Sequence, residues 1–430
     1  MKMASLYHGG NNILFLTGME ERRYYIMKSK NETQATINAQ APDNMTQPQE
    51  LQDMEPTQAN EQQVTPTATQ DEAEIAALEA QQEEAAITTP SDLQATTQQA
   101  APVVPADAWS YFCGGHFDKE VDENRPYATR KTGFDNLDMK QRFAPGLYIL
   151  GGVSATGKTT FAYQLADQMA TQGEDVLYFS LEQTKFELFS KSISREFFLE
   201  SEQTPFQPTY SSFEIRCGLA HDNHPMELQA RVNSYLQKVG DRLKIITLDS
   251  PPAVETIASI VEGYIQQTGR KPFVVVDYLQ IIKPTVIANR PLEGRASIDH
   301  IITSLKNLQM RLKLTLLAIS SINRANYTLQ IDFESFKESG MIEYTADAVW
   351  ALQLAIVSKH PGFNGTGKNE LGITAKRKLI QEEKARNPRL VELVCLKTRH
   401  SVGTYTVDFE YYPASDAFMM PIGAGGVRMP

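Results

Sequence analysis

Cysteine is scarce in the sequence, and long apolar runs are missing from it. The 430 residues include three cysteines, Cys113, Cys217 and Cys395, whose wide spacing gives neither a disulfide framework nor a zinc site. No stretch approaches the roughly 18 consecutive apolar residues that a membrane span needs. The apolar residues 13–16 form too short a run for a signal peptide. These absences argue against a membrane partner and favour a cytoplasmic protein.

Basic residues are also missing from one long segment. Between Asn31 and Asp107 there are 14 acidic residues and no Lys or Arg, among many Gln, Thr, Ala and Pro. The whole chain has a formal net charge of −11, so the remainder carries +3. A segment this polar buries too little apolar surface to offset its chain entropy. We therefore expect residues 27–107 to be a disordered acidic tail, which serves either as a solvated tether or as a docking segment for a partner.

The first 26 residues differ in composition from both the acidic tail and the rest of the chain. Within them, the codons for Glu21-Arg22-Arg23 can form a purine run that resembles a bacterial ribosome-binding site, and this run ends three codons before Met27. We hypothesise that translation starts at Met27. Mass spectrometry of the native amino-terminal peptide tests this, and an intact Met1 peptide would exclude it.

From about residue 127 the sequence changes to alternating strands and helices. This alternation predicts an α/β fold with a doubly wound, mostly parallel sheet and helices on both faces. The pattern continues to about residue 418. We expect a folded domain at 127–418, a connecting segment at 108–126 and a flexible end at 419–430.

A glycine-rich turn follows the first apolar strand of this domain and precedes a helical stretch at 159–171. Glycines let backbone N–H groups close around phosphates, and a helix start adds about half a positive charge. In this arrangement Lys158 reaches the β- and γ-phosphates, and the Thr159 hydroxyl binds Mg²⁺. The turn predicts an ATP and Mg²⁺ site. Its residues are Gly152, Ser154, Gly157, Lys158, Thr159 and Thr160.

Three further strands are followed by carboxylates. Ligands of open α/β sheets bind at the carboxyl ends of the strands, so each carboxylate is a candidate for the site. Glu182 is either the general base for the attacking water or an ordinary residue at a helix start. Asp277 ends a fully apolar strand and suits a role in holding Mg²⁺. For Asp249 we favour a capping role before a helix that begins near Ala253.

Polar and basic residues follow the later strands as well. A strand at 316–320 leads into Ser321 and then into a polar segment that we expect to be a loop as far as Gly340. Another strand leads into Lys397 and Arg399, and residues 404–412 alternate as a terminal strand. The two cations are either part of a solvated turn or contacts to phosphates in the site of a neighbouring subunit.

About two-thirds of the chain, from residue 127 to 418, resembles the RecA-like ATPase domain of DnaB-type replicative helicases, which belong to helicase superfamily 4. Several blocks carry the resemblance in the order that the family has them. They are Thr132-Gly-Phe-Asp-Asn-Leu-Asp138, the phosphate loop, Phe179-Ser-Leu-Glu182, Val276-Asp-Tyr-Leu-Gln280, Ser320-Ser-Ile-Asn323-Arg324 and Lys337-Glu-Ser-Gly340-Met-Ile-Glu343, followed by Ala346-Asp347.

The resemblance implies a homo-hexameric ring that hydrolyses ATP between subunits and translocates on single-stranded DNA. Glu182 then corresponds to the catalytic base, and Lys397 with Arg399 to the basic pair that one subunit inserts into the next subunit's site. Asp277 with Gln280 belongs to the nucleotide site. The resemblance assigns DNA binding to Arg324, Lys337, Glu338 and Gly340.

The sequence departs from the family in four places. Ser321 stands where the family usually has Gln, and its shorter side chain puts the sensing of the γ-phosphate in question. His400-Ser401 replaces an Asn-Gly turn, and residues 358–389 form an apparent basic insertion. The acidic tail stands in place of the family's helical amino-terminal domain, and a primase or a loader is a candidate partner for this tail.

These departures leave two hypotheses of different class. The first is an ATP-dependent DNA helicase, which the blocks around Asp277 and Lys337 favour. The second is a regulatory or assembly ATPase, similar to RecA or KaiC-type proteins, that binds DNA or a partner without unwinding. Ser321 and the absence of the helical amino-terminal domain favour the second.

Overall fold

The computed structural model describes residues 107–421 except 285, 288–289, 293, 323–326, 337–339, 365–369 and 402. The expectations for the first 106 residues, including the start at Met27 and nearly all of the acidic tail, lie outside these described residues. The same holds for Arg324, Lys337 and Glu338. Within the described part, no helix is long and apolar enough to cross a membrane.

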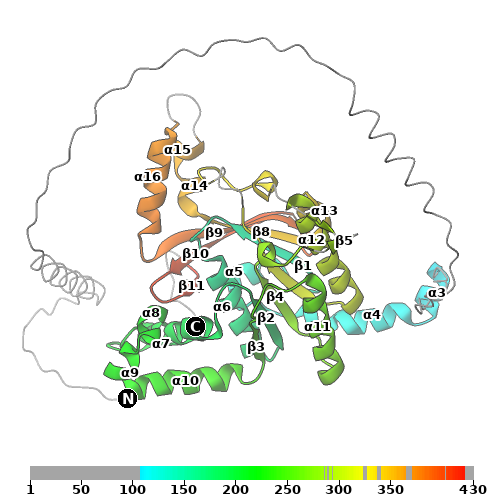
Figure 1. The fold of residues 1–430 in the computed structure, drawn as a ribbon, viewed down its shortest axis with the longest axis horizontal. Helices are drawn as coiled ribbons and strands as arrows, with labels where there is room; N and C mark the ends of the chain where they lie inside the picture. Colours follow the sequence, from blue (N-terminus) through cyan, green and yellow to red (C-terminus); the bar gives the residue numbers. More distant parts are fainter. Residues whose placement is uncertain are drawn as a thin grey trace, which may run out of the picture. The chain divides into compact units, whose positions relative to one another are not determined.

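A nine-stranded sheet forms the centre of the fold (Figure 1). Six neighbouring strands are parallel, and three at one edge are antiparallel, which confirms the expected α/β class with a mostly parallel sheet. In spatial order the strands are β11 (Ala417–Met419), β10 (Tyr405–Tyr412), β9 (Arg389–Thr398), β8 (Ala348–Leu354), β1 (Gly146–Gly152), β7 (Thr315–Ile319), β4 (Phe273–Asp277), β2 (Val176–Ser180) and β3 (Leu243–Ile246).

Successive residues of the central strands point to opposite faces of the sheet, and both faces are buried. Tyr148 and Leu150 of β1 belong to one hydrophobic core, whereas Leu147 and Ile149 belong to the other. Helices α6 (Lys158–Thr171), α7 (Lys185–Gln203) and α10 (Pro225–Val239) cover the first face. Helices α11 (Val254–Thr268) and α12 (Gly294–Leu312) cover the second, as Figure 1 shows. This double cover explains why the strands are apolar along their whole length.

Helix α7 begins with a capping box in which Thr184 and Glu187 satisfy each other's backbone N–H groups.

The elements not yet named are shorter. The other helices are α3 (Ala108–Cys113), α4 (His116–Asn124), α5 (Asp135–Asp138), α8 (Ser212–Arg216), α9 (Leu219–Asn223), α13 (Met341–Thr345), α14 (Ala355–Lys359), α15 (Pro361–Asn364) and α16 (Ile373–Lys384), with 3₁₀ turns η1 (Arg125–Ala128), η2 (Leu279–Ile281) and η4 (Phe333–Phe336) and a hairpin of β5 (Val286–Ile287) and β6 (Arg290–Pro291).

Two local expectations were wrong, and a third needs a detail added. Asp249 does not cap a helix, because the N-cap of α11 is Ala253 and no side chain accepts a hydrogen bond there. The polar segment before Gly340 is mostly loop where it is described, and its 3₁₀ turn η4 places Phe336 in the core. Strand β10 is not the last strand, because a turn after Tyr412 brings β11 back to pair with it.

The expected basic insertion at 358–389 lies largely in helices. Helices α14, α15 and α16 follow one another above the end of β8, at the top of Figure 1, and lead directly into β9. Helix α16 is held by Ile380, which is 7% exposed and packs into the core, and by Lys376, which donates to the carbonyl of Phe363 at 3.0 Å. The segment is therefore packed against the domain.

Candidate nucleotide site

The phosphate loop connects the end of β1 to the start of α6. Gly157 has φ 91°, and a Cβ atom on it would lie 2.8 Å from the ring of Phe418, so this position requires glycine. A Cβ on Gly152 would lie 2.7 Å from the carbonyl oxygen of Leu352. The loop borders a cavity of about 910 Å³, whose lining includes the expected nucleotide residues Gly152, Ser154, Gly157, Lys158, Thr159, Thr160 and Asp277.

The ammonium of Lys158 is folded back onto its own loop. It donates to the carbonyl oxygens of Gly152 at 2.9 Å and Val153 at 3.2 Å. Burial lowers the pKa of Lys158, while the nearby carboxylates of Asp277 and Glu182 oppose this shift. A partly buried ammonium with acidic neighbours at a helix start is suited to bind a phosphate, which would give it a full charge partner.

Two carboxylates face the same cavity from neighbouring strands. Asp277, at the end of β4, is 2% exposed and accepts a hydrogen bond from the Tyr178 hydroxyl at 2.8 Å. Burial raises its pKa to about 6, and hydrogen bonds from Tyr178 and Thr159 act against that shift. Glu182 follows β2, is exposed to the cavity and lies before the N-cap of α7, which is Thr184. Glu182 is therefore not part of a helix start.

The donor set beside the loop fits a magnesium ion. Mg²⁺ prefers oxygen ligands, usually one or two carboxylates together with substrate phosphates. The hydroxyl of Thr159 and the carboxylate of Asp277 are close enough for a hydrogen bond between them to affect the pKa of Asp277. These two residues would hold the ion, and the ion would neutralise charge on the phosphates.

Gln280, expected in the nucleotide site, does not line the cavity. Its amide nitrogen donates to the hydroxyl of Ser320 at 3.1 Å, and its amide oxygen accepts from the backbone N–H of Ser321 at 3.2 Å. Ser321 itself does line the cavity. Gln280 thus connects the end of β4 to the end of β7. It holds the backbone of Ser321, the residue that stands where the family usually has Gln.

The sequence motifs did not predict several of the residues that line the cavity. Arg389 and Tyr411 line it, and the Arg389 guanidinium lies 5.4 Å from the centroid of the Tyr411 ring. Tyr411 is 7% exposed and its ring stacks on Phe418 at 4.4 Å, so of these two residues the Arg389 guanidinium is the group suited to stack on a flat nucleobase. Lys191 also lines the cavity and forms an ion pair of 2.6 Å with Asp416. No local motif marks these residues, because they come from elements far apart in the chain.

Lys397 and Arg399 lie where the parallel strands begin, whereas the phosphate loop lies where they end. These two ends of the strands form opposite edges of the sheet. Because β9 is antiparallel to β8, its end pairs with the beginning of β8, and Ala348 lies between Thr398 and Tyr148. Gly152 lies four positions after Tyr148 in β1, which is about 13 Å along the strand. The Arg399 guanidinium instead contacts Asp347 at 2.9 Å, and Lys397 donates to the carbonyl oxygen of Tyr344 at 3.3 Å.

Of the four residues expected to bind DNA, Gly340 alone belongs to the described part of the chain. It precedes helix α13 as its N-cap, and a Cβ atom there would collide with the guanidinium of Arg295. The Arg295 side chain is flexible and 66% exposed, so it can move aside, and this contact does not by itself require glycine.

A sequence model of the DnaB-like helicase C terminal domain matches residues 130–411, which is more than half of the chain. The chain belongs to the DnaB-like helicase family. No curated protein matches the sequence. The match to the family model confirms the resemblance seen in the motif blocks, and this DnaB-like chain is a member of a family of replicative helicases.

Two solved structures share the fold of this DnaB-like chain. One is an isolated ATPase domain that is 19% identical, with a TM-score of 0.55, and the match covers 74% of this chain and 100% of that one. The other is a DnaB-like replicative helicase, solved in a study of its interactions with primase. It is also 19% identical, with a TM-score of 0.53, and that match covers 80% of this chain and 71% of the other. At this identity the two structures support the RecA-like fold.

Proposed function

We propose that this DnaB-like chain is an ATP-dependent DNA helicase that assembles as a homo-hexamer, hydrolyses ATP between subunits and translocates on single-stranded DNA. The observation that carries the proposal is the placement of two sets of residues at opposite edges of one sheet. Lys158, Glu182 and Asp277 line the cavity at one edge, whereas Arg399 lies at the other. A single subunit cannot bring these sets together, but neighbours in a ring can.

Each residue has a defined task in the proposed reaction. The backbone N–H groups of the phosphate loop and the ammonium of Lys158 bind the phosphates. The carboxylate of Glu182, exposed to the cavity, takes a proton from the attacking water. Mg²⁺, when bound by Thr159 and Asp277, supplies charge neutralisation on the phosphates. The guanidinium of Arg399 from the next subunit stabilises the charge that develops on the transferred phosphoryl group.

An unwinding assay on forked DNA tests the proposal. The full chain with ATP should separate the strands, whereas Lys158→Ala should not, because it lacks the phosphate-binding ammonium. DNA-stimulated hydrolysis without strand separation would reject the helicase and favour the regulatory or assembly ATPase. The specific observation in favour of that second function is Ser321, whose short side chain faces the cavity at the end of β7.

The acidic residues 31–107 extend this proposal to a partner. We propose that they provide the contact with a primase or a loader, since a long acidic segment without Lys or Arg can bind a basic surface. Removing residues 31–100 from the full chain should weaken binding to such a partner and leave ATP hydrolysis unchanged. Unchanged partner binding would reject this role.

A further inference from the structure

Four consecutive carbonyl groups of the phosphate loop each accept a hydrogen bond from a cationic side chain. Lys158 contacts those of Gly152 and Val153 at 2.9 and 3.2 Å. Two further cations reach the crest of the loop from outside it. Lys384 donates to the carbonyl of Ser154 at 3.1 Å, and Arg389 donates to the carbonyl of Ala155 at 2.9 Å.

The two outer cations come from one segment of the same chain. Lys384 is in the last turn of α16, and Arg389 is the first residue of β9. Helix α16 cannot move freely, because Ile380 is buried and Glu383 accepts a hydrogen bond from the backbone of Leu390 at 3.4 Å. The contacts to the loop are therefore made from a fixed support.

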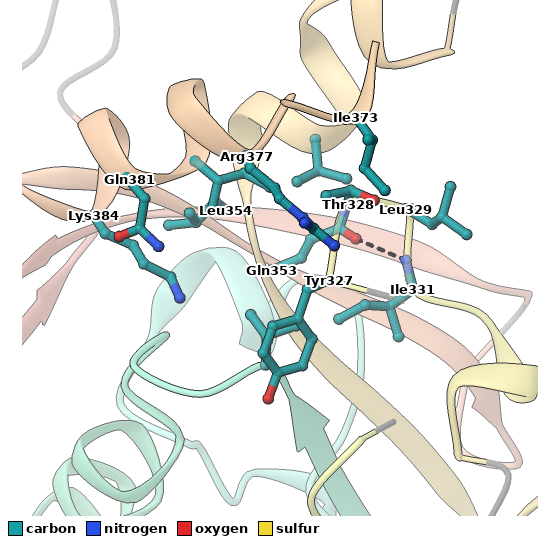
Figure 2. Close-up of a pocket in the computed structure, with 13 residues that line it drawn as sticks. Tyr327, Thr328, Leu329, Ile331, Gln353, Leu354, Ile373, Arg377, Gln381 and Lys384 are labelled. Carbon is teal, nitrogen blue, oxygen red and sulfur yellow. Dashed lines mark hydrogen bonds between the residues drawn. The ribbon is translucent and has the colours of Figure 1, made fainter. Parts of the chain in front are cut away.

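Lys384 is partly shielded from solvent and makes specific contacts. Its ammonium lies 5.9 Å from the centroid of the Tyr327 ring, and burial lowers its pKa, with Arg389 adding to the shift. Within the described residues no carboxylate forms an ion pair with it. Figure 2 shows Lys384 beside Gln381. Both residues line a cavity of about 260 Å³, which Val153 of the phosphate loop also lines. A partly desolvated ammonium in this place is compensated by the Ser154 carbonyl and the face of Tyr327.

We propose that Lys384 is a positioning residue for the phosphate loop, an inference that rests on the proposed use of ATP. A peptide group presents its C=O and N–H in opposite directions. By holding the Ser154 carbonyl outward, Lys384 keeps the neighbouring N–H groups turned inward, where they form a nest for a phosphate. When Lys158 turns toward bound phosphates it leaves the carbonyls of Gly152 and Val153, so Lys384 and Arg389 alone continue to hold the loop from outside.

This role has a signature in nucleotide binding. A preorganised loop acts on the phosphates that ADP and ATP have in common, so loss of Lys384 should weaken both nucleotides by a similar factor, about tenfold. A direct contact to the γ-phosphate would instead weaken ATP and leave ADP unchanged. In steady state the KM for ATP should rise while kcat changes little. Arg389 is less suitable for the test, because it also packs on Tyr411 in the cavity wall.

The experiment compares Lys384→Met with Lys378→Met in the full chain. Met keeps the apolar stem, and Lys378 is a control on the same helix with a side chain that is 79% exposed. Fluorescent ADP and ATP analogues report the dissociation constants, and the unfolding temperature without nucleotide reports folding. We expect both affinities to fall for Lys384→Met, to return with Lys384→Arg, and to stay unchanged in the control.

Each other outcome has a clear meaning. Unchanged affinities for Lys384→Met, or a loss confined to ATP, would overturn the positioning role. Failure of the unsubstituted chain to bind either nucleotide would overturn the proposed function itself. If Lys384→Met does not fold, Lys384→Leu replaces it, since Leu keeps an apolar side chain and has no donor; wild-type affinity for both nucleotides would then count against the inference.

Discussion

The guanidinium of Arg399 contacts the carboxylate of Asp347 at 2.9 Å, at the edge of the sheet opposite to the phosphate loop. Asp347 is 5% exposed and also accepts from the backbone N–H of Leu147 at 2.7 Å and from Lys306 at 2.5 Å. Asp347 therefore keeps two partners if Arg399 turns toward another subunit. The Arg399 side chain is 53% exposed, so its ion pair contributes little to folding, about 0–1 kcal/mol.

Arg399→Ala should reduce ATP hydrolysis by roughly 10³-fold or more while nucleotide binding stays nearly intact, because the guanidinium acts across a subunit boundary. Arg142→Ala, an exposed cation just before β1, is the matched control. Mixing Arg399→Ala with Lys158→Ala should restore part of the activity, since some interfaces then combine an intact loop with an intact finger. No recovery in mixed assemblies, or a loss of binding equal to the loss of turnover, would reject the assignment.

Glu182→Gln should lower turnover by at least about 100-fold, because the amide cannot take a proton from water. Affinity for ATP should change little, since Glu182 is not part of the phosphate loop. Single-turnover hydrolysis and nucleotide titration measure the two effects. Glu255→Gln, an exposed residue in the first turn of α11, provides the control. A Glu182→Gln variant with wild-type turnover would remove Glu182 as the general base.

Lys337→Ala should weaken binding to single-stranded DNA and reduce the slope of log affinity against log salt by about one. The reason is that each lysine on a phosphate releases about one counterion. Fluorescence anisotropy with labelled oligonucleotides at several salt concentrations measures the slope. Lys378→Ala, on the exposed face of α16, should leave it unchanged. Equal slopes for Lys337→Ala and the unsubstituted chain would argue against a DNA contact at this position.

The protein should become less stable at acidic pH, and we expect His400 to cause part of this loss. Burial lowers the pKa of His400 in the folded protein, where it stacks on Tyr148 with a centroid distance of 5.8 Å; Asp347 opposes the shift, and Lys306 and Arg399 add to it. The unfolded chain then binds a proton more readily, so stability is lost as the pH drops through about 6.5.

Urea unfolding at pH 7.5 and 5.5 measures this loss. His400→Gln should reduce it by up to about 1 kcal/mol, whereas His221→Gln should not change it, because the His221 side chain is 77% exposed. If the pH dependence of His400→Gln matches that of the unsubstituted chain, another group carries it.

Much of the candidate site could be predicted from the sequence. The phosphate loop follows a strand and precedes a helix, and Glu182 and Asp277 each follow a strand of the same parallel sheet. The carboxyl ends of parallel strands meet at one edge, so local order along the chain was sufficient to bring these residues to one cavity. Helix caps were less predictable. Asp is a residue type that often caps helices, but Asp249 does not cap α11, which begins at Val254 and has Ala253 as its N-cap.

The sequence by itself indicated that the loop lies at the carboxyl end of a strand, because the order of strand, glycine-rich turn and helix is a local feature of the chain. It could not show that Lys384 and Arg389 reach the carbonyls of Ser154 and Ala155, contacts that join residues more than two hundred positions apart. Nor could it show that Arg399 lies at the far edge, which depends on β9 running antiparallel to β8. These relationships exist only once the sheet has formed, because packing and strand direction, and no local pattern, decide which distant residues meet.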